Sequence, residues 1–260
     1  MKPKIIVLDW AGTTVDFGSF APVAAVMRAF EDFGLRPTLE ETRAPMGLAK
    51  RTHLALMLSG ERLAAAWAEK YGRSPGEAEI DRVYARFEPA LKAVLGEHAD
   101  LLPGVAETTA RLRASGFKIG STTGYSRAMM DMVVPAARAA GYAPDVLACP
   151  DEVGGLGRPY PYMLWRALEK LGAESIAGVV KVGDTLADIA EGLNAGCLSL
   201  GVIAGSSLLG LTRAELEALP ESEKKTRYEG VRAQYLAAGA SGVLDDFTEL
   251  PGWLDAFHER

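Results

Sequence analysis

The chain has 260 residues, of which 48% are hydrophobic and 24% charged, and its net charge is −6. This composition is typical of a soluble globular protein with one or two domains. No window approaches the roughly 20 consecutive apolar residues that cross a membrane. Because the net charge is negative and no Lys/Arg-rich run occurs, nucleic acid is disfavoured as a partner.

Two further features predict a cytoplasmic protein. Strand-like sequence begins within a few residues of the N-terminus, which leaves no room for a signal peptide. The only cysteines, Cys149 and Cys197, lie in separate strand-like segments and are expected to be reduced and buried. The negative charge also means that local cations or a metal ion would have to hold an anionic substrate.

Short β-type segments alternate with helical patterns along much of the chain. The predicted strands are residues 5–8, 118–122, 146–149, 178–182 and 198–202, with a weaker sixth at 243–244. The predicted helices are residues 105–115, 128–140, 161–171 and 186–195, and a long polar stretch at 212–238. This alternation predicts an α/β fold with a doubly wound parallel sheet.

One long region interrupts the alternation with helical segments only. Thr38 and Glu41 form a capping-box pattern, which marks a helix start. A later apolar repeat at helical spacing predicts a helix that Pro89 should kink or restart. We predict an α-helical cap domain at residues 20–100, inserted into a catalytic core of residues 1–19 and 101–260.

Polar residues follow three of the predicted strands. Asp9 ends the first strand, Thr123 and Gly124 follow the second, and Asp184 follows the fourth. Because ligands of such sheets bind at the carboxyl ends of the strands, we expect these residues to meet. Asp9 and Asp184 are the best pair for Mg²⁺. Asp188, one helical turn after Asp184, would orient these ligands without binding the metal itself.

Other groups in this set suit an anion. The Thr123 hydroxyl and the N–H groups near Gly124 can bind phosphoryl oxygens, and the planar guanidinium of Arg158 suits a phosphate or phosphonate. Each motif also has an ordinary interpretation: a simple turn, a surface arginine, or Asp184 as a helix cap beside a solvated Asp188. Their shared order along the chain favours the catalytic interpretation.

This ordered set of Asp9, Thr123, Arg158, Asp184 and Asp188 resembles the haloacid dehalogenase superfamily, whose phosphotransferases attack phosphorus with the first aspartate. In most of those enzymes, a second aspartate two positions later protonates the leaving oxygen. Here that position is Ala11. Because a phosphate ester benefits from a general acid, its loss disfavours a phosphatase or a phosphomutase.

Lys50 offers a different chemistry. With a helix from about Gly47, Lys50 and His53 would share a face. A partly desolvated lysine has a lowered pKa and can form a Schiff base with an aldehyde, and a histidine can move protons for it. Such a pair is often merely solvated. However, an iminium would accept the electrons of a breaking phosphorus–carbon bond, whose leaving group is a carbanion.

Five segments closely resemble the phosphonatase family of that superfamily, namely residues 9–16, 45–53, 120–131, 157–163 and 181–196. The resemblance implies hydrolysis of phosphonoacetaldehyde to acetaldehyde and phosphate, in 2-aminoethylphosphonate degradation. It implies that Lys50 forms the Schiff base while Asp9 attacks phosphorus and becomes an aspartyl phosphate. It also implies a homodimer joined through the cap domains.

The same resemblance implies the remaining residue roles. Mg²⁺ would be held by Asp9, the Ala11 carbonyl and Asp184. Met46, His53 and Tyr125 would lie near the Lys50 nitrogen and assist proton transfer. The residues expected to contact substrate are Ala11, Met46, Gly124 and Tyr125.

Three alternatives stay open at this stage. A phosphatase or phosphomutase of the same superfamily is disfavoured by Ala11. A dehalogenase would need no Mg²⁺, so strict metal dependence would exclude it. A non-catalytic phosphate-binding module on the same fold would bind ligand without turnover.

Overall fold

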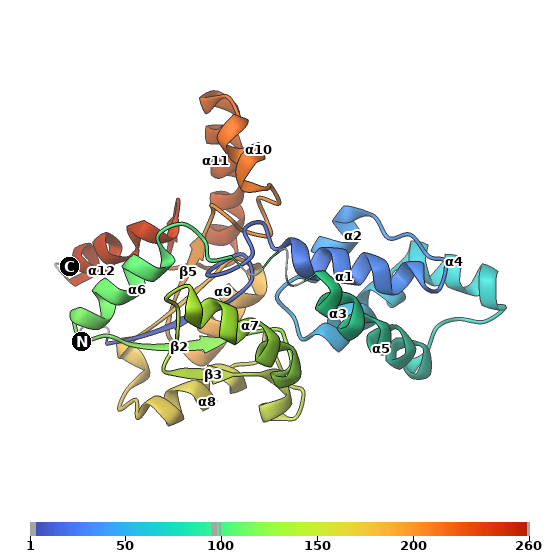
Figure 1. Cartoon of the computed structure of the whole chain (residues 1–260), viewed down its shortest axis with the longest axis horizontal. Coiled ribbons are helices and arrows are strands. Elements are labelled where there is room, and N and C mark those ends of the chain that lie inside the picture. The colour runs from blue at the N-terminus through green and yellow to red at the C-terminus, as the bar shows by residue number, and fades with distance from the viewer. Residues whose placement is uncertain (1–3, 95–97, 99, 259–260) are drawn as a thin grey trace.

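The computed structural model describes residues 4–94, 98 and 100–258. The predicted domain ranges also contain residues 1–3, 95–97, 99, 259 and 260, which lie outside the described residues. Six parallel strands form one sheet in the order β3-β2-β1-β4-β5-β6 (Figure 1). They are β1 Ile5–Leu8, β2 Lys118–Thr122, β3 Val146–Ala148, β4 Val179–Gly183, β5 Leu198–Val202 and β6 Gly242–Leu244. The predicted doubly wound α/β core is therefore confirmed.

Helices cover both faces of this sheet because its central strands are apolar on both faces. Ile6 and Leu8 of β1 belong to the cluster that contains residues of α6, α7 and α12. Ile5 and Val7 pack instead with residues of α8. The helices of the core are α6 Val105–Ala114, α7 Arg127–Ala139, α8 Tyr162–Leu171, α9 Leu186–Ala195, α10 Arg213–Ala218, α11 Glu221–Ala237 and α12 Leu250–His258, with 3₁₀ turns η2 Pro150–Val153, η3 Ile176–Gly178 and η4 Phe247–Glu249.

The register of the sheet aligns the strand ends that carry the predicted site. Leu8, the last residue of β1, is paired with Ser121 of β2 and with Val182 of β4. The residues that follow these strands therefore emerge at one edge of the sheet, as expected for parallel strands.

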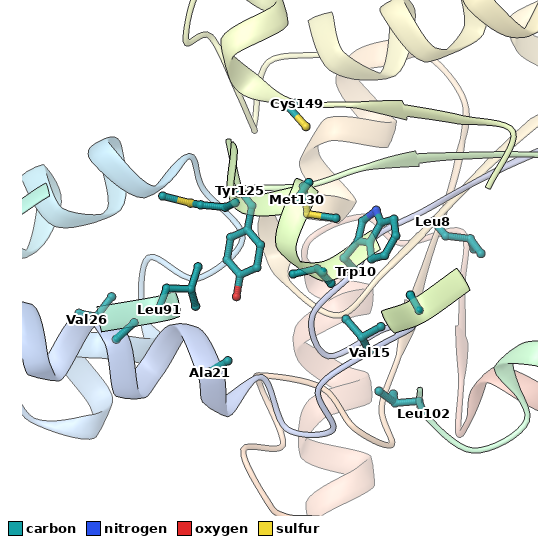
Figure 2. Packing of buried hydrophobic residues seen from close by; sticks show 14 of the residues in the cluster. Leu8, Trp10, Val15, Ala21, Val26, Leu91, Leu102, Tyr125, Met130 and Cys149 are labelled. Carbon is teal, nitrogen blue, oxygen red and sulfur yellow. The ribbon is translucent and has the colours of Figure 1, made fainter. Parts of the chain in front are cut away.

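Between β1 and β2, the described residues form helices and add no strand to the sheet. We call residues 20–94 the helical insertion; it contains α1 Phe20–Glu31, α2 Leu39–Arg43, α3 Lys50–Ser59, α4 Glu61–Tyr71 and α5 Glu77–Val94. These helices lie together on the right of Figure 1, beside the sheet core. Figure 2 shows that the apolar cluster is continuous from Trp10 and Tyr125 of the core to Val26 and Leu91 of the insertion. The exact domain boundaries remain a prediction.

The insertion confirms one helix signal and corrects two others. Thr38 caps α2 in a capping box with Glu41, as predicted. Of the kink or restart expected at Pro89, the restart is wrong: α5 continues through Pro89, and the buried face formed by Val83, Phe87 and Leu91 holds both halves in one helix. The helix around Lys50 begins at Lys50 itself rather than near Gly47, because Gly47 has a φ of +89°, outside the helical region.

Smaller corrections concern the core. The stretch at 212–238 forms two helices, since Leu219 is extended before Pro220, as residues before proline prefer. The predicted ends of the third, fourth and sixth strands each differ from the structure by one residue. Both cysteines are free and buried, as expected. Within the described residues, every helix is too short or too polar to span a bilayer.

Candidate active site

The predicted site residues converge on a small enclosed cavity where the helical insertion meets the carboxyl ends of β1, β2 and β4. The cavity has a volume of about 20 Å³, enough for about one water molecule. Nine of the eleven predicted residues line it: Asp9, Ala11, Met46, Lys50, Thr123, Gly124, Tyr125, Arg158 and Asp184. The other two, His53 and Asp188, are fully buried close to them.

The turn after β1 brings two carboxylates together. Gly12 has a φ of +84°, and a Cβ atom there would lie 2.2 Å from Asp184 Oδ2. Only glycine therefore fits between the first strand and Asp184. The Thr14 hydroxyl donates to the Asp9 carbonyl oxygen at 3.0 Å, which fixes the turn. The side chain at Ala11 carries no acid that could protonate a leaving group.

Three carboxylates form a candidate cation site. Asp9, Asp184 and Asp188 each offer an oxygen, and these oxygens lie within 4.8 Å of one another. Burial, followed by the negative charges of Asp9 and Asp188, raises the pKa of Asp184 well above its usual range. Among the described residues, no Lys, Arg or His side chain pairs with Asp184 within 4.0 Å. Asp184 therefore has no cationic side-chain partner among these residues, and together with Asp9 it offers oxygen ligands that fit a hard divalent cation.

Asp188 has a different environment, which supports an orienting role. Its carboxylate lies 2.8 Å from Lys181 Nζ and 3.1 Å from Arg158 Nη2, and it accepts a hydrogen bond from the Thr185 hydroxyl at 2.6 Å. Burial opposes ionisation, but these two cations dominate and hold its pKa below the usual value. Its charge is therefore already balanced by protein groups.

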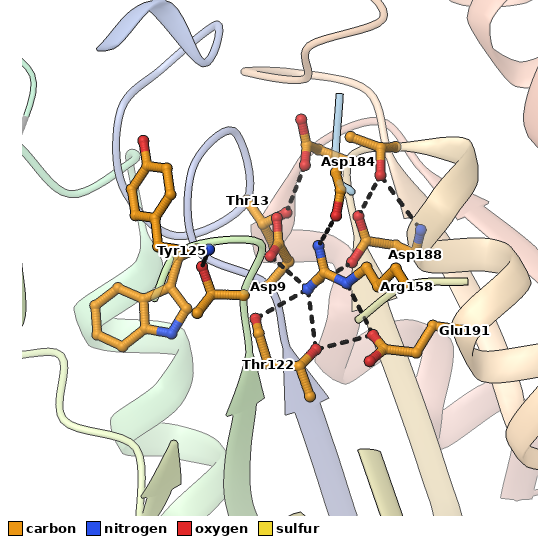
Figure 3. Close-up of polar contacts among 12 residues, drawn as sticks. Asp9, Thr13, Thr122, Tyr125, Arg158, Asp184, Asp188 and Glu191 are labelled. Carbon is orange, nitrogen blue, oxygen red and sulfur yellow. Dashed lines mark hydrogen bonds and ion pairs between the residues drawn. The ribbon is translucent and has the colours of Figure 1, made fainter. Parts of the chain in front are cut away.

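Arg158 is buried in the centre of the site and is not the surface residue of the alternative interpretation (Figure 3). Its Nη2 lies 2.6 Å from Asp9 Oδ1 and donates to the Thr122 carbonyl at 2.9 Å. Nη1 donates to the Gly47 carbonyl of the helical insertion at 3.3 Å. Arg158 thus contacts the candidate nucleophile and the insertion at once.

Lys50 is a buried amine without an acidic partner. Its side chain is 5% exposed, and Nζ lies 3.7 Å from Met46 Sδ and 5.4 Å from the centre of the Tyr125 ring. No carboxylate of the described residues lies within ion-pair distance of Nζ. Burial lowers the pKa of Lys50 to about 8, although the negative charge of Asp9 opposes the shift. A substantial fraction of this amine is therefore neutral near pH 8.

The remaining polar groups around Lys50 are also buried. His53 lies one turn further along α3, and neither ring nitrogen makes a well-formed hydrogen bond within the described residues. Burial and the positive charge of Lys50 lower the pKa of His53 well below its usual value, although the Thr42 backbone opposes the shift. The Tyr125 hydroxyl is likewise buried without a partner among the described residues.

Core and insertion lie in close contact at two glycines. A Cβ atom on Gly124 would lie 2.6 Å from the Leu48 carbonyl oxygen, and one on Gly47 would lie 2.2 Å from Thr185 Oγ1. These contacts limit how closely the segment just before Lys50 can approach the core. The Thr123 hydroxyl accepts the Tyr125 backbone N–H at 3.1 Å, which stabilises the same turn.

We expect Gly124→Ala to reduce kcat/KM by about 10- to 100-fold, because an added methyl group must push Lys50 away from Asp9 and small misplacements are costly in catalysis. Gly230→Ala is the matched control, since a Cβ there meets no atom within 4 Å. Steady-state kinetics and thermal melting would be measured on both. Wild-type kcat/KM in Gly124→Ala would show that this contact does not set the catalytic geometry.

Sequence reasoning missed three residues of this site: Thr122, Lys181 and Glu191. All three are fully buried and contact Arg158 or Asp188. The sequence did hold a signal for one of them. Lys181 interrupts the apolar run of β4, and a lysine in a strand buried on both faces requires acidic partners.

A larger open groove of about 980 Å³ lies elsewhere, beside α10, α11 and η4. Exposed charged side chains such as Lys225 and Glu221 line it, and it contains none of the predicted site residues. The smaller cavity is therefore the better candidate, because it combines buried carboxylates with the lysine and the arginine.

Comparison with known proteins assigns this chain to a class of hydrolases. A family model of haloacid dehalogenase-like hydrolases matches residues 3–196, and the chain belongs to this family. Within the family it is similar along nearly its whole length to phosphonoacetaldehyde hydrolases. That of Bacillus cytotoxicus is 43% identical, over 96% of this chain and 95% of the relative. That of Bacteroides fragilis is 44% identical, over 100% of this chain and 98% of the relative.

Two further relatives add detail. A bifunctional phosphonoacetaldehyde hydrolase/aminoethylphosphonate transaminase of Clostridioides difficile is 45% identical over 96% of this chain, which covers 39% of that longer protein. A crystal structure of a phosphonoacetaldehyde hydrolase-like protein from Oleispira antarctica superimposes with a TM-score of 0.97 at 35% identity, covering 100% of this chain and 94% of the other. The resemblance to the phosphonatases is therefore confirmed.

Proposed function

We propose that this protein hydrolyses the phosphorus–carbon bond of phosphonoacetaldehyde, giving acetaldehyde and phosphate. The observation that carries the proposal is the buried Lys50 amine, which lines the same cavity as Asp9 and has no acidic partner among the described residues. The names of the relatives support the same reaction. Ala11 supports a leaving group that needs an electron sink rather than a general acid.

The proposed reaction has two covalent intermediates, an iminium on Lys50 and an aspartyl phosphate on Asp9. The neutral Lys50 amine adds to the aldehyde, and the resulting carbinolamine takes up one proton and loses water, which gives an iminium. Asp9 then attacks phosphorus, and the electrons of the breaking phosphorus–carbon bond enter the iminium to form an enamine. Protonation of the enamine carbon and addition of water release acetaldehyde and regenerate Lys50. A second water hydrolyses the aspartyl phosphate and releases phosphate.

We propose that Asp9, the Ala11 carbonyl and Asp184 hold a Mg²⁺ ion, with Asp188 orienting them. A divalent ion bound there neutralises charge on the transferring phosphoryl group. Arg158 binds the phosphonate oxygens with its planar guanidinium, and the Thr123 hydroxyl and Gly124 lie beside it. His53 and Tyr125, both buried beside Lys50, move protons during imine formation and hydrolysis, and Met46 packs against the amine.

We further propose that residues 20–100 form a cap domain that opens for substrate and closes for reaction. The cavity of about 20 Å³ supports this, because phosphonoacetaldehyde is much larger than one water molecule. On the family resemblance we propose a cytoplasmic homodimer joined through its cap domains. The aldehyde substrate would arise from 2-aminoethylphosphonate, a proposal that the bifunctional relative's name supports.

The test is to incubate the purified protein with phosphonoacetaldehyde and to assay phosphate and acetaldehyde, with and without a chelator. We expect equal amounts of both products, loss of activity after chelation, and recovery on addition of Mg²⁺. Added borohydride should stop turnover and leave a reduced adduct on Lys50, located by peptide mapping. Metal-independent activity or release of phosphate from esters alone would contradict the proposal and favour a dehalogenase or a phosphatase.

The pH dependence of the reaction should report Lys50. Because only the neutral amine attacks an aldehyde and burial lowers the Lys50 pKa to about 8, we expect kcat/KM to rise tenfold per pH unit below about pH 8 and to level off above it. Reductive trapping of acetaldehyde, which has no ionisable group, should show the same inflection. An inflection near the ordinary lysine pKa of 10.5 would contradict this assignment.

A further inference from the structure

Beneath Asp9 and Arg158 lies a layer of buried polar groups to which the proposed mechanism gives no role. Thr122 ends β2, Lys181 lies in the middle of β4, and Glu191 belongs to α9. All three are fully buried, and the fold brings them together from distant parts of the chain. Figure 3 shows Thr122 and Glu191 on the side of Arg158 away from Asp184.

The Thr122 hydroxyl forms hydrogen bonds with three charged side chains. It donates to Glu191 Oε2 at 2.9 Å and accepts from Arg158 Nη2 and Lys181 Nζ, each at 2.9 Å. A hydroxyl has one proton to donate and two lone pairs to accept with. Thr122 therefore uses its full hydrogen-bonding capacity, and no donor or acceptor is left for solvent.

These contacts fix the plane of the Arg158 guanidinium. Nε donates to Glu191 Oε2 at 2.9 Å, while Nη2 is committed to Asp9 and Thr122. Because the guanidinium is rigid and planar, holding these two edges sets the direction of the third nitrogen. Nη1 has a single, longer contact of 3.3 Å to the Gly47 carbonyl. It is the nitrogen that is most available to a ligand.

The charges in this layer also balance. Two carboxylates, Asp188 and Glu191, face two cations, Arg158 and Lys181, at distances of 2.8 to 3.3 Å. Charges that are paired in this way can be buried at much lower cost than an unpaired charge. These contacts therefore hold Arg158 in place, and none of them involves the Asp184 carboxylate.

We propose that Thr122, Lys181 and Glu191 are positioning residues that orient Arg158 toward the phosphorus group of the substrate. The proposal rests on the function proposed above, in which Arg158 binds phosphonate oxygens. Thr122 precedes the predicted site residue Thr123 and points into the protein interior, so its role differs from that of its neighbour.

The test compares Thr122→Val, which removes the hydroxyl at nearly constant volume, with Thr122→Ser, which keeps it. Binding of inorganic phosphate in the presence of Mg²⁺ would be measured by calorimetry, together with kcat and KM. We expect Thr122→Val to weaken phosphate binding and lower kcat/KM by about 10- to 100-fold, the range for groups that orient a reactive site. Thr122→Ser should stay within a few-fold of wild type. Equal values for both variants would overturn the proposal.

Glu191→Gln provides a second variant and distinguishes positioning from simple electrostatics. Removing a negative charge beside Arg158 would strengthen phosphate binding if only net charge mattered. A positioning role predicts weaker binding, because a neutral amide holds Arg158 and Lys181 less firmly. Weaker binding in this variant supports the proposal even if Thr122→Val fails to fold, and tighter binding overturns it.

These measurements separate the two proposals. Phosphate binding is measured whether or not the protein cleaves phosphonoacetaldehyde. Reductive trapping of acetaldehyde at Lys50 should be unchanged in Thr122→Val, since no group of this layer contacts Lys50 within the described residues. Weakened phosphate binding without any wild-type turnover would uphold the positioning role and reject the function. Normal turnover by the wild type, with phosphate binding unchanged in Thr122→Val and Glu191→Gln, would uphold the function and reject the positioning role.

Discussion

Lys50→Arg should abolish release of phosphate from phosphonoacetaldehyde, with a fall in kcat on the order of 10⁴-fold or more. Arginine keeps a positive charge in the cavity, but its delocalised guanidinium does not form an imine with an aldehyde. The departing electrons of the phosphorus–carbon bond would then have no acceptor. Borohydride should trap no adduct in this variant.

Two controls separate lost chemistry from lost structure. Lys92→Arg makes the same change at an exposed position of the helical insertion and should leave the kinetics unchanged. Lys50→Met should lose activity without losing stability, because burial already disfavours the ammonium form of Lys50. Near-normal turnover in Lys50→Arg would reject the imine mechanism, whatever the behaviour of the controls.

Asp9→Asn should also reduce phosphate release on the order of 10⁴-fold, for a different reason. An amide of nearly the same shape has no free carboxylate to attack phosphorus. The buried Arg158 would lose its 2.6 Å partner, and the candidate cation site would lose one of its carboxylates. Mg²⁺ affinity, measured by calorimetry, should therefore fall as well.

The two variants should differ in one observable. In Asp9→Asn the Lys50 amine is intact, so borohydride should still trap the substrate aldehyde on Lys50 while no phosphate appears. In Lys50→Arg both signals should be lost. Turnover by Asp9→Asn would reject Asp9 as the nucleophile, and loss of its trapped adduct would show that imine formation depends on the carboxylate.

Much of this fold was predictable because its strands and helices have strong, simple patterns. Runs such as Ile5–Leu8 are apolar at every position, which fits central parallel strands covered on both faces. The errors occurred where local signals compete with packing. Pro89 ought to interrupt α5, but the face that contains Val83 and Phe87 is buried and keeps the helix continuous.

The site residues that could be predicted stand at strand ends or in short motifs. Asp9, Thr123 and Asp184 each follow a strand, and parallel strands place such positions at one edge. Glu191 has no comparable signal, because an acidic residue in a helix usually faces water. Its burial depends on Lys181 and Arg158, which come from other elements.

Local patterns and side-chain chemistry were enough to predict the order of strands and helices, the position of the helical insertion and the chemical types of the candidate site residues. The folded chain was needed to show that Lys50 is buried beside Asp9 and that its pKa is lowered to about 8. It was also needed to show that Thr122, Lys181 and Glu191 lie together around Arg158. Burial and charge pairing arise between residues far apart in the chain, and local sequence patterns do not specify them.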